Sequence, residues 1–165
     1  MTDRFMRSPD RFTAGTVGEV GQRMFLIQAV SGPELVTVKV EKQQLAVLAT
    51  YLTRAIEPLG RPGHLPDDLD LQLSPDDGID MIAGEISVAI DEETGTVEVV
   101  IEDVDEETGP ARFTLEVSRE QAAAFAIHAT RLVESGRPPC PLCGLPLDPR
   151  GHDCPRTNGH RAPIT

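Results

Sequence analysis

Two stretches of the sequence show the same succession of hydrophobic patterns, and this repetition limits the folds that the chain can adopt. Each stretch has three short segments with the spacing of β-strands, separated by turn-forming residues, and then a segment with helical spacing. The strand patterns cover 12–17, 24–30 and 35–40 in the first stretch and 84–90, 97–101 and 112–117 in the second. The helical patterns cover 42–59 and the residues after Ser118, where a capping box is predicted.

Individual residues also match between the two stretches at a nearly constant offset. Gln44 corresponds to Gln121, Thr53 to Thr130 and Glu57 to Glu134, and both stretches end in Gly-Arg-Pro. We therefore predict an internal duplication of one strand-strand-strand-helix unit, with the two copies related by a pseudo-twofold axis. The pattern leaves open whether each unit has its own sheet or both units join into one.

These patterns predict an α+β fold of two duplicated β-β-β-α units, in which each antiparallel sheet is covered by one amphipathic helix. We expect a first unit at 1–63, an acidic linker at 64–83, a second unit at 84–136 and a metal-binding tail at 137–165. Within the linker, 69–73 alternate like a short edge strand, although a mobile loop fits the sequence as well.

The tail contains all three cysteines of the chain and two of its four histidines. Cys140 and Cys143 have the spacing of a zinc knuckle, and Cys154 would supply a third thiolate. His152 is favoured as the fourth ligand, with His160 as the alternative. Protein ligands at all four positions indicate a structural, zinc-ribbon-like site with Zn2+ rather than a catalytic one. An odd number of clustered cysteines also argues against disulfides and for a cytoplasmic protein.

The net charge of −12 is concentrated in the middle of the chain, where no Lys or Arg occurs between Arg61 and Arg112. Such a surface repels phosphate backbones, so general nucleic-acid binding is disfavoured. Contact with nucleic acid through Arg150, Arg156 and Arg161 in the tail is a weaker alternative. No apolar run is long enough to span a bilayer, and residues 1–7 contain no apolar secretory core, so we expect neither a membrane span nor a secretory signal.

Other residues with chemical potential have simpler structural interpretations. His128 lies in the middle of a predicted helix and is more typical of packing than of catalysis. His64, which is close to Asp67 and Asp68 in sequence, fits a solvated loop better than a metal site. The glycines from Gly15 to Gly21 match no phosphate-binding motif and indicate a hairpin turn.

The opening segment 10–18, the residues 41–44 at the entry to the first helix and the tail 140–159 resemble an uncharacterised actinobacterial family catalogued as a "repeat protein" of unknown function. The resemblance covers nearly the whole chain and is most specific in the tail. It implies a cytoplasmic protein and brings no established activity, so it assigns no catalytic residue.

The sequence favours a non-enzymatic accessory protein whose zinc-stiffened tail presents a surface to a protein partner. The alternative is an enzyme with an acidic cleft between the two units, using residues such as Asp67, Asp70 or Glu85. The edges of short sheets would also allow a homo-oligomer.

Overall fold

The computed structural model describes residues 3–19, 21–75, 78–104, 111–135 and 141–142. The predicted zinc ligands Cys140, Cys143, His152, Cys154 and the alternative His160 lie outside the described residues. Zinc binding by these residues therefore stays a prediction.

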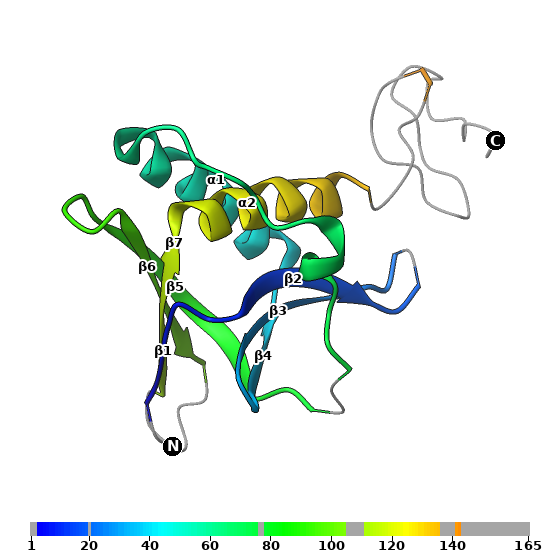
Figure 1. Cartoon of the computed structure of the whole chain (residues 1–165). Coiled ribbons are helices and arrows are strands. Elements are labelled where there is room, and N and C mark those ends of the chain that lie inside the picture. The colour runs from blue at the N-terminus through cyan, green and yellow to red at the C-terminus, as the bar shows by residue number, and fades with distance from the viewer. Residues whose placement is uncertain (1–2, 20, 76–77, 105–110, 136–140, 143–165) are drawn as a thin grey trace.

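Seven strands and two α-helices follow the order β1, β2, β3, β4, α1, β5, β6, β7, α2 (Figure 1). The strands are β1 (Arg4–Arg7), β2 (Arg11–Val17), β3 (Met24–Ser31), β4 (Glu34–Val40), β5 (Met81–Asp91), β6 (Thr96–Asp103) and β7 (Arg112–Ser118). The helices are α1 (Lys42–Ile56) and α2 (Arg119–Glu134), with short 3-10 turns η1 (Glu57–Leu59) and η2 (Asp68–Leu71). The mixed α+β class predicted from the sequence is confirmed.

All seven strands belong to one sheet with the order β1-β7-β6-β5-β4-β3-β2. The β1–β7 and β4–β5 pairs are parallel, and the other pairs are antiparallel. The β4–β5 pair is short, because only Val38 and Lys39 pair with Met81 and Ile82. The two sets of three antiparallel strands are thus joined into one sheet, which was one of the two arrangements that the sequence left open.

The two edge strands of the sheet are close together in sequence, and the sheet must therefore curve strongly to bring them near each other. β1 and β2 lie at opposite ends of the strand order, yet only residues 8–10 separate them. Such a link can span at most about 14 Å. Helix α2 contacts β2 at one end of the sheet and β7, the neighbour of the edge strand β1, near the other end.

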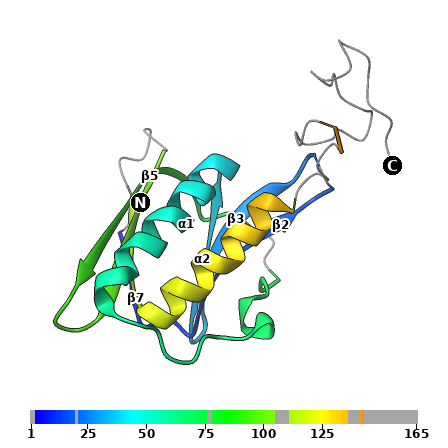
Figure 2. The ribbon, with the colours of Figure 1, turned by 90° about the horizontal axis from the view of Figure 1, so that it is seen from above.

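Helices α1 and α2 pack against each other and lie side by side over the same face of the sheet (Figure 2). Their apolar stripes and the inward-facing strand residues form one hydrophobic core. Its fully buried large side chains include Ile27, Leu45, Leu48, Leu52, Ile101, Phe113, Leu115 and Phe125. No helix in the described part of the chain is long and apolar enough to cross a membrane.

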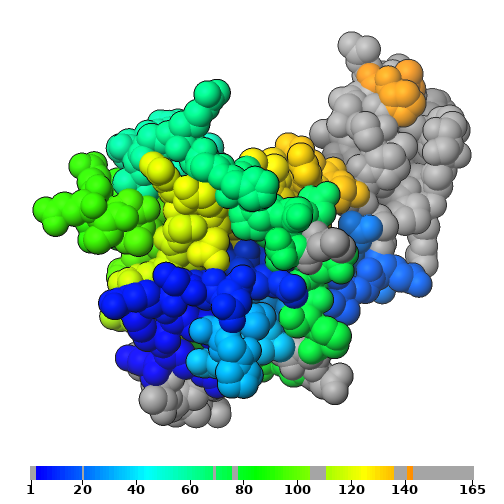
Figure 3. Space-filling view, in the orientation of Figure 1, coloured from blue at the N-terminus to red at the C-terminus, as the bar shows by residue number. Residues whose placement is uncertain are grey.

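Residues 64–75 and 78–80, which we call the strap, pack against the face of β2, β3 and β4 that points away from α2. Figure 3 shows residues of this part of the chain, in green, at the surface beside the blue residues of the first strands. The Thr13 hydroxyl donates a hydrogen bond to the Leu71 carbonyl oxygen at 2.5 Å. The buried Gln28 amide donates to the Ser74 carbonyl at 3.0 Å and accepts from the Ser74 N–H at 2.7 Å. This segment contains η2 and packs on the sheet, so it is not the edge strand considered at 69–73.

Candidate binding groove

The contact between α2 and β2 is tightly packed. The rings of Phe12 and Phe125 are stacked with their centroids 4.2 Å apart and their planes 5° from parallel. His128 Nε2 lies 2.9 Å from the Ala14 carbonyl oxygen, a distance at which the ring N–H donates to it. The histidine thus satisfies a carbonyl of an edge strand and has a structural role, as the sequence suggested.

Gln44 and Gln121 perform the same task at the start of the two helices. Each side-chain oxygen accepts a hydrogen bond from the backbone N–H of the N-cap residue, Glu41 at 2.8 Å and Ser118 at 3.2 Å. Each side-chain nitrogen also reaches the chain beside the helix. Gln44 donates to the carbonyl oxygens of Ala83 at 3.2 Å and Gly84 at 2.8 Å. Gln121 donates to the carbonyl oxygen of Pro9, just before β2, at 2.7 Å.

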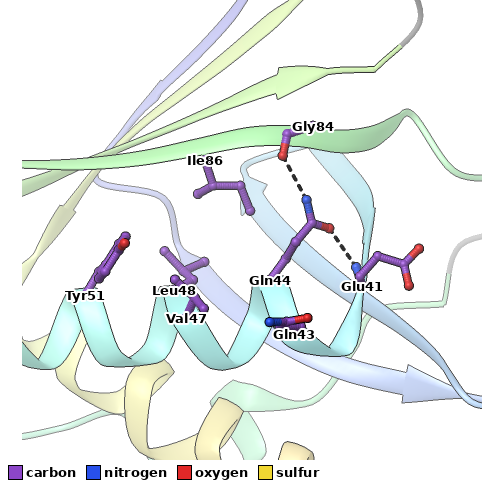
Figure 4. A pocket seen from close by; sticks show the side chains of 8 residues that line it. All are labelled: Glu41, Gln43, Gln44, Val47, Leu48, Tyr51, Gly84 and Ile86. Carbon is purple, nitrogen blue, oxygen red and sulfur yellow. Dashed lines mark hydrogen bonds between the residues drawn. The ribbon is translucent and has the colours of Figure 1, made fainter.

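Beyond Gln44, α1 and β5 are separated by an open groove with a volume of about 440 Å³ (Figure 4). Figure 4 shows side chains of α1 and Ile86 of β5 pointing into the space between the two elements. The groove is lined by Glu41, Gln43, Gln44, Val47, Leu48, Tyr51, Gly84 and Ile86. Val47 and Tyr51, one helical turn apart on α1, are 41% and 48% exposed.

One edge of β5 is unpaired beside this groove. Within the described residues, β4 pairs with β5 only at Met81 and Ile82, whereas β6 pairs with β5 on its other side as far as Asp91. From Gly84 onward no described strand pairs with this edge, and α1 lies over the adjoining face of the sheet. An unpaired edge presents alternating backbone N–H and C=O groups, which can accept another extended chain.

The groove contains few groups that could perform chemistry. Glu41 at the N-cap of α1 and Tyr51, nearly three turns further along, are the titratable residues among those lining it. Within the described part of the chain, no three His, Cys, Asp or Glu side chains form a group that could hold a metal ion. The mostly apolar lining of the groove suits binding of an apolar segment.

The acidic residues considered for an enzyme do not meet in this groove. Asp70 lines a separate hollow of about 210 Å³ together with Asp10 and Arg11. Asp67 and Glu85 are exposed and line neither of these two hollows. His64 is also exposed.

Glu120, in the first turn of α2, has a shifted pKa. Its Oε1 atom accepts hydrogen bonds from the Gly63 N–H at 3.1 Å and from Arg119 Nε at 3.2 Å. The Gly63 hydrogen bond, assisted by Arg119, holds the pKa of Glu120 below its ordinary value, although partial burial opposes the shift. Glu120 thus ties the chain after η1 to the start of α2. At the matching place in α1, Gln43 lines the open groove.

Sequence reasoning missed the groove, although one signal was present. Val47 and Tyr51 are apolar residues outside the stripe of Leu45, Leu48 and Leu52 that faces the core. A second apolar stripe on a helix indicates a further contact surface.

No curated protein and no solved structure matches the chain. A family model described as "Protein of unknown function (DUF3090)" matches residues 5–154, which include nearly every element described above. The chain therefore belongs to this family of proteins of unknown function.

Proposed function

We propose that the protein is a non-enzymatic binding module and that the α1–β5 groove receives a segment of a partner protein. The observation that carries this proposal is the exposure of Val47 and Tyr51 beside an unpaired strand edge. A functionless helix–strand contact would be expected to close over such side chains, as α2 and β2 do through Phe12 and Phe125.

We further propose that the two halves are copies of one β-β-β-α unit. The matched hydrogen bonds of Gln44 and Gln121 support this proposal. The hydroxyl groups of Thr53 and Thr130 give similar support, because each donates to the carbonyl four residues earlier at 2.8 Å. On this view one helix–strand contact became filled and the other stayed open for a partner.

The tail is a second proposed contributor. We propose that Cys140, Cys143 and Cys154, with His152 or His160, hold one structural Zn2+ and stiffen a surface used in the cytoplasm by a protein partner. The spacing of the thiol residues supports this. We expect about one zinc per chain by elemental analysis of the full-length protein. Cys140→Ser should lower the zinc content while the folded body persists. Metal-free protein with freely alkylated thiols and unchanged order would overturn the zinc proposal.

The groove is tested with two matched variants of the full chain. Val47→Arg places a charge in the groove, and Ile127→Arg places the same charge on α2, where Ile127 is 45% exposed and does not line the groove. Random peptides displayed on phage are selected on the wild-type protein, and the enriched peptides are tested on both variants. Binding should be lost in Val47→Arg and retained in Ile127→Arg.

Two results would contradict the groove as the binding site. One is the absence of any enriched peptide, and the other is equal binding of the enriched peptides to both variants. Matching circular dichroism spectra and urea midpoints of the two variants would show that folding does not explain a difference.

A further inference from the structure

We infer that the segment bound by the groove is an extended strand that pairs through its backbone with the unpaired edge of β5 and carries alternating apolar and basic side chains. This inference rests on the proposed function. It adds the conformation and the chemistry of the ligand, neither of which follows from the presence of a groove.

The strand conformation follows from the backbone of β5. The Gln44 side-chain nitrogen donates hydrogen bonds to the carbonyl oxygens of Ala83 and Gly84. In the other half, His128 reaches the carbonyl of Ala14 in the middle of β2. Tyr51 stands at the matching position of α1, and within the described residues its side chain makes no hydrogen bond to β5. The edge of β5 beyond Gly84 therefore keeps backbone groups that an added strand can satisfy.

The apolar side chains of the ligand follow from the walls of the groove. Successive side chains of a strand point to opposite sides, so every second residue of an added strand would face Val47, Leu48 and Ile86. The remaining residues would face solvent on the outer side of β5, where Glu85, Ser87 and Ala89 are exposed. A ligand with alternating apolar and polar residues fits both environments.

The basic residues follow from the charges around the groove. Residues 41–56 and 81–93, which form α1, its cap, β5 and the start of the following turn, carry five carboxylates and two cations. The carboxylates are Glu41, Glu85, Asp91, Glu92 and Glu93, and the cations are Lys42 and Arg54. Glu98 of β6, opposite Ala89, adds a further negative charge. This excess attracts a basic segment and repels an acidic one.

The same charges argue against a second copy of the chain as the occupant. An antiparallel β5–β5 pair centred on Val88 would place Glu85 of each copy opposite Asp91 of the other. Like charges directly opposite each other destabilise a strand pair. The full chain also has a net charge of −12, which opposes self-association.

The experiment uses the full chain and random peptides of about eight residues, the length that spans the open edge. Enriched peptides should alternate apolar residues with Lys or Arg. The most enriched peptide is then resynthesised with one backbone N-methyl group at each position in turn. Methylation should weaken binding about tenfold at every second position, where an N–H faces β5, and have little effect at the positions between. A version with each basic residue changed to Glu should not bind.

The outcomes separate this inference from the proposed function. If Val47→Arg abolishes binding but the N-methyl series shows no alternation, the groove binds a ligand that is not an added strand, and the inference fails alone. Enriched peptides that are acidic would also overturn it. A dimer in light scattering that Val47→Arg dissociates would identify a second copy as the occupant and would likewise contradict it.

Discussion

Strands β2 and β5 begin the two sets of three antiparallel strands, yet they differ in how they are covered. Four successive residues of β2, from Phe12 to Gly15, are buried, because α2 packs on one face and the strap on the other. In β5 no residue after Ala83 is fully buried, and exposed and half-buried residues alternate to Asp91. The same local arrangement of strand and helix therefore produces a closed contact at β2 and an open one at β5.

A few side chains account for this difference. At matching positions, α2 has Ala124 and Phe125 where α1 has Val47 and Leu48. Phe125 is completely buried on Phe12, and Ala124 is 4% exposed, whereas Val47 is 41% exposed. The apolar pattern thus predicts the helix and the strand that pack together in each half. The size and shape of the individual side chains determine whether the space between them is filled or stays open.

The largest effect should come from removing the aromatic ring that closes the α2–β2 contact. Phe125→Ala should lower the free energy of unfolding by about 3–5 kcal/mol, because it leaves a cavity beside Phe12. Val47→Ala, on the open groove, should change it by less than about 0.5 kcal/mol. Urea unfolding measures both. Equal losses would mean that the groove is not open.

A smaller loss should come from the outer face of β2. A Cβ atom on Gly15 would collide with the Leu73 side chain of the strap, so Gly15→Val should destabilise the protein by about 1–3 kcal/mol. Ala89→Val, on the exposed outer face of β5, serves as the matched control and should be nearly neutral. A neutral Gly15→Val would show that the strap does not press on β2.

Gln44 and Gln121 make matching hydrogen bonds at the open α1–β5 contact and at the closed α2–β2 contact, so their loss should have similar effects on stability. Gln44→Ala and Gln121→Ala should each cost about 1–2 kcal/mol, since each removes a hydrogen bond to the N-cap and at least one to the neighbouring chain. Urea unfolding of both variants tests this. A large loss for one and none for the other would contradict the equivalence of the two positions.

The smallest effect concerns Glu120. Because its folded pKa is lowered, its carboxylate stabilises the protein above the pKa of the unfolded chain, and this contribution is lost as the pH falls through the folded pKa. Glu120→Gln should therefore be slightly less stable than wild type at neutral pH, and the difference should vanish in acid. Urea midpoints of both proteins from about pH 7 to about pH 3 measure it. A difference that grows in acid would contradict the assignment.

Most of the local structure could be predicted from the sequence. The strand patterns at 24–30 and 112–117 coincide with β3 and β7 to within one residue, and the capping box at Ser118 begins α2. Strand β1 was missed, because four residues, Arg4–Arg7, show no clear alternation and pair with β7 more than a hundred positions away. The strap was left undecided, since its polar contacts to Thr13 and Gln28 follow no local pattern.

By itself the sequence determined the class of the fold, the order of the two helices and of six of the seven described strands, and the approximate position of each of these elements, because apolar periodicity, capping and turn residues act over a few neighbouring positions. The tertiary structure decided which contacts are filled and which are open. That outcome depends on the curvature of the sheet, whose two edge strands are joined by residues 8–10, and on the packing of Phe125 against Phe12 at the α2–β2 contact. These are contacts between distant residues, and their fit is set by shape and volume rather than by spacing along the chain.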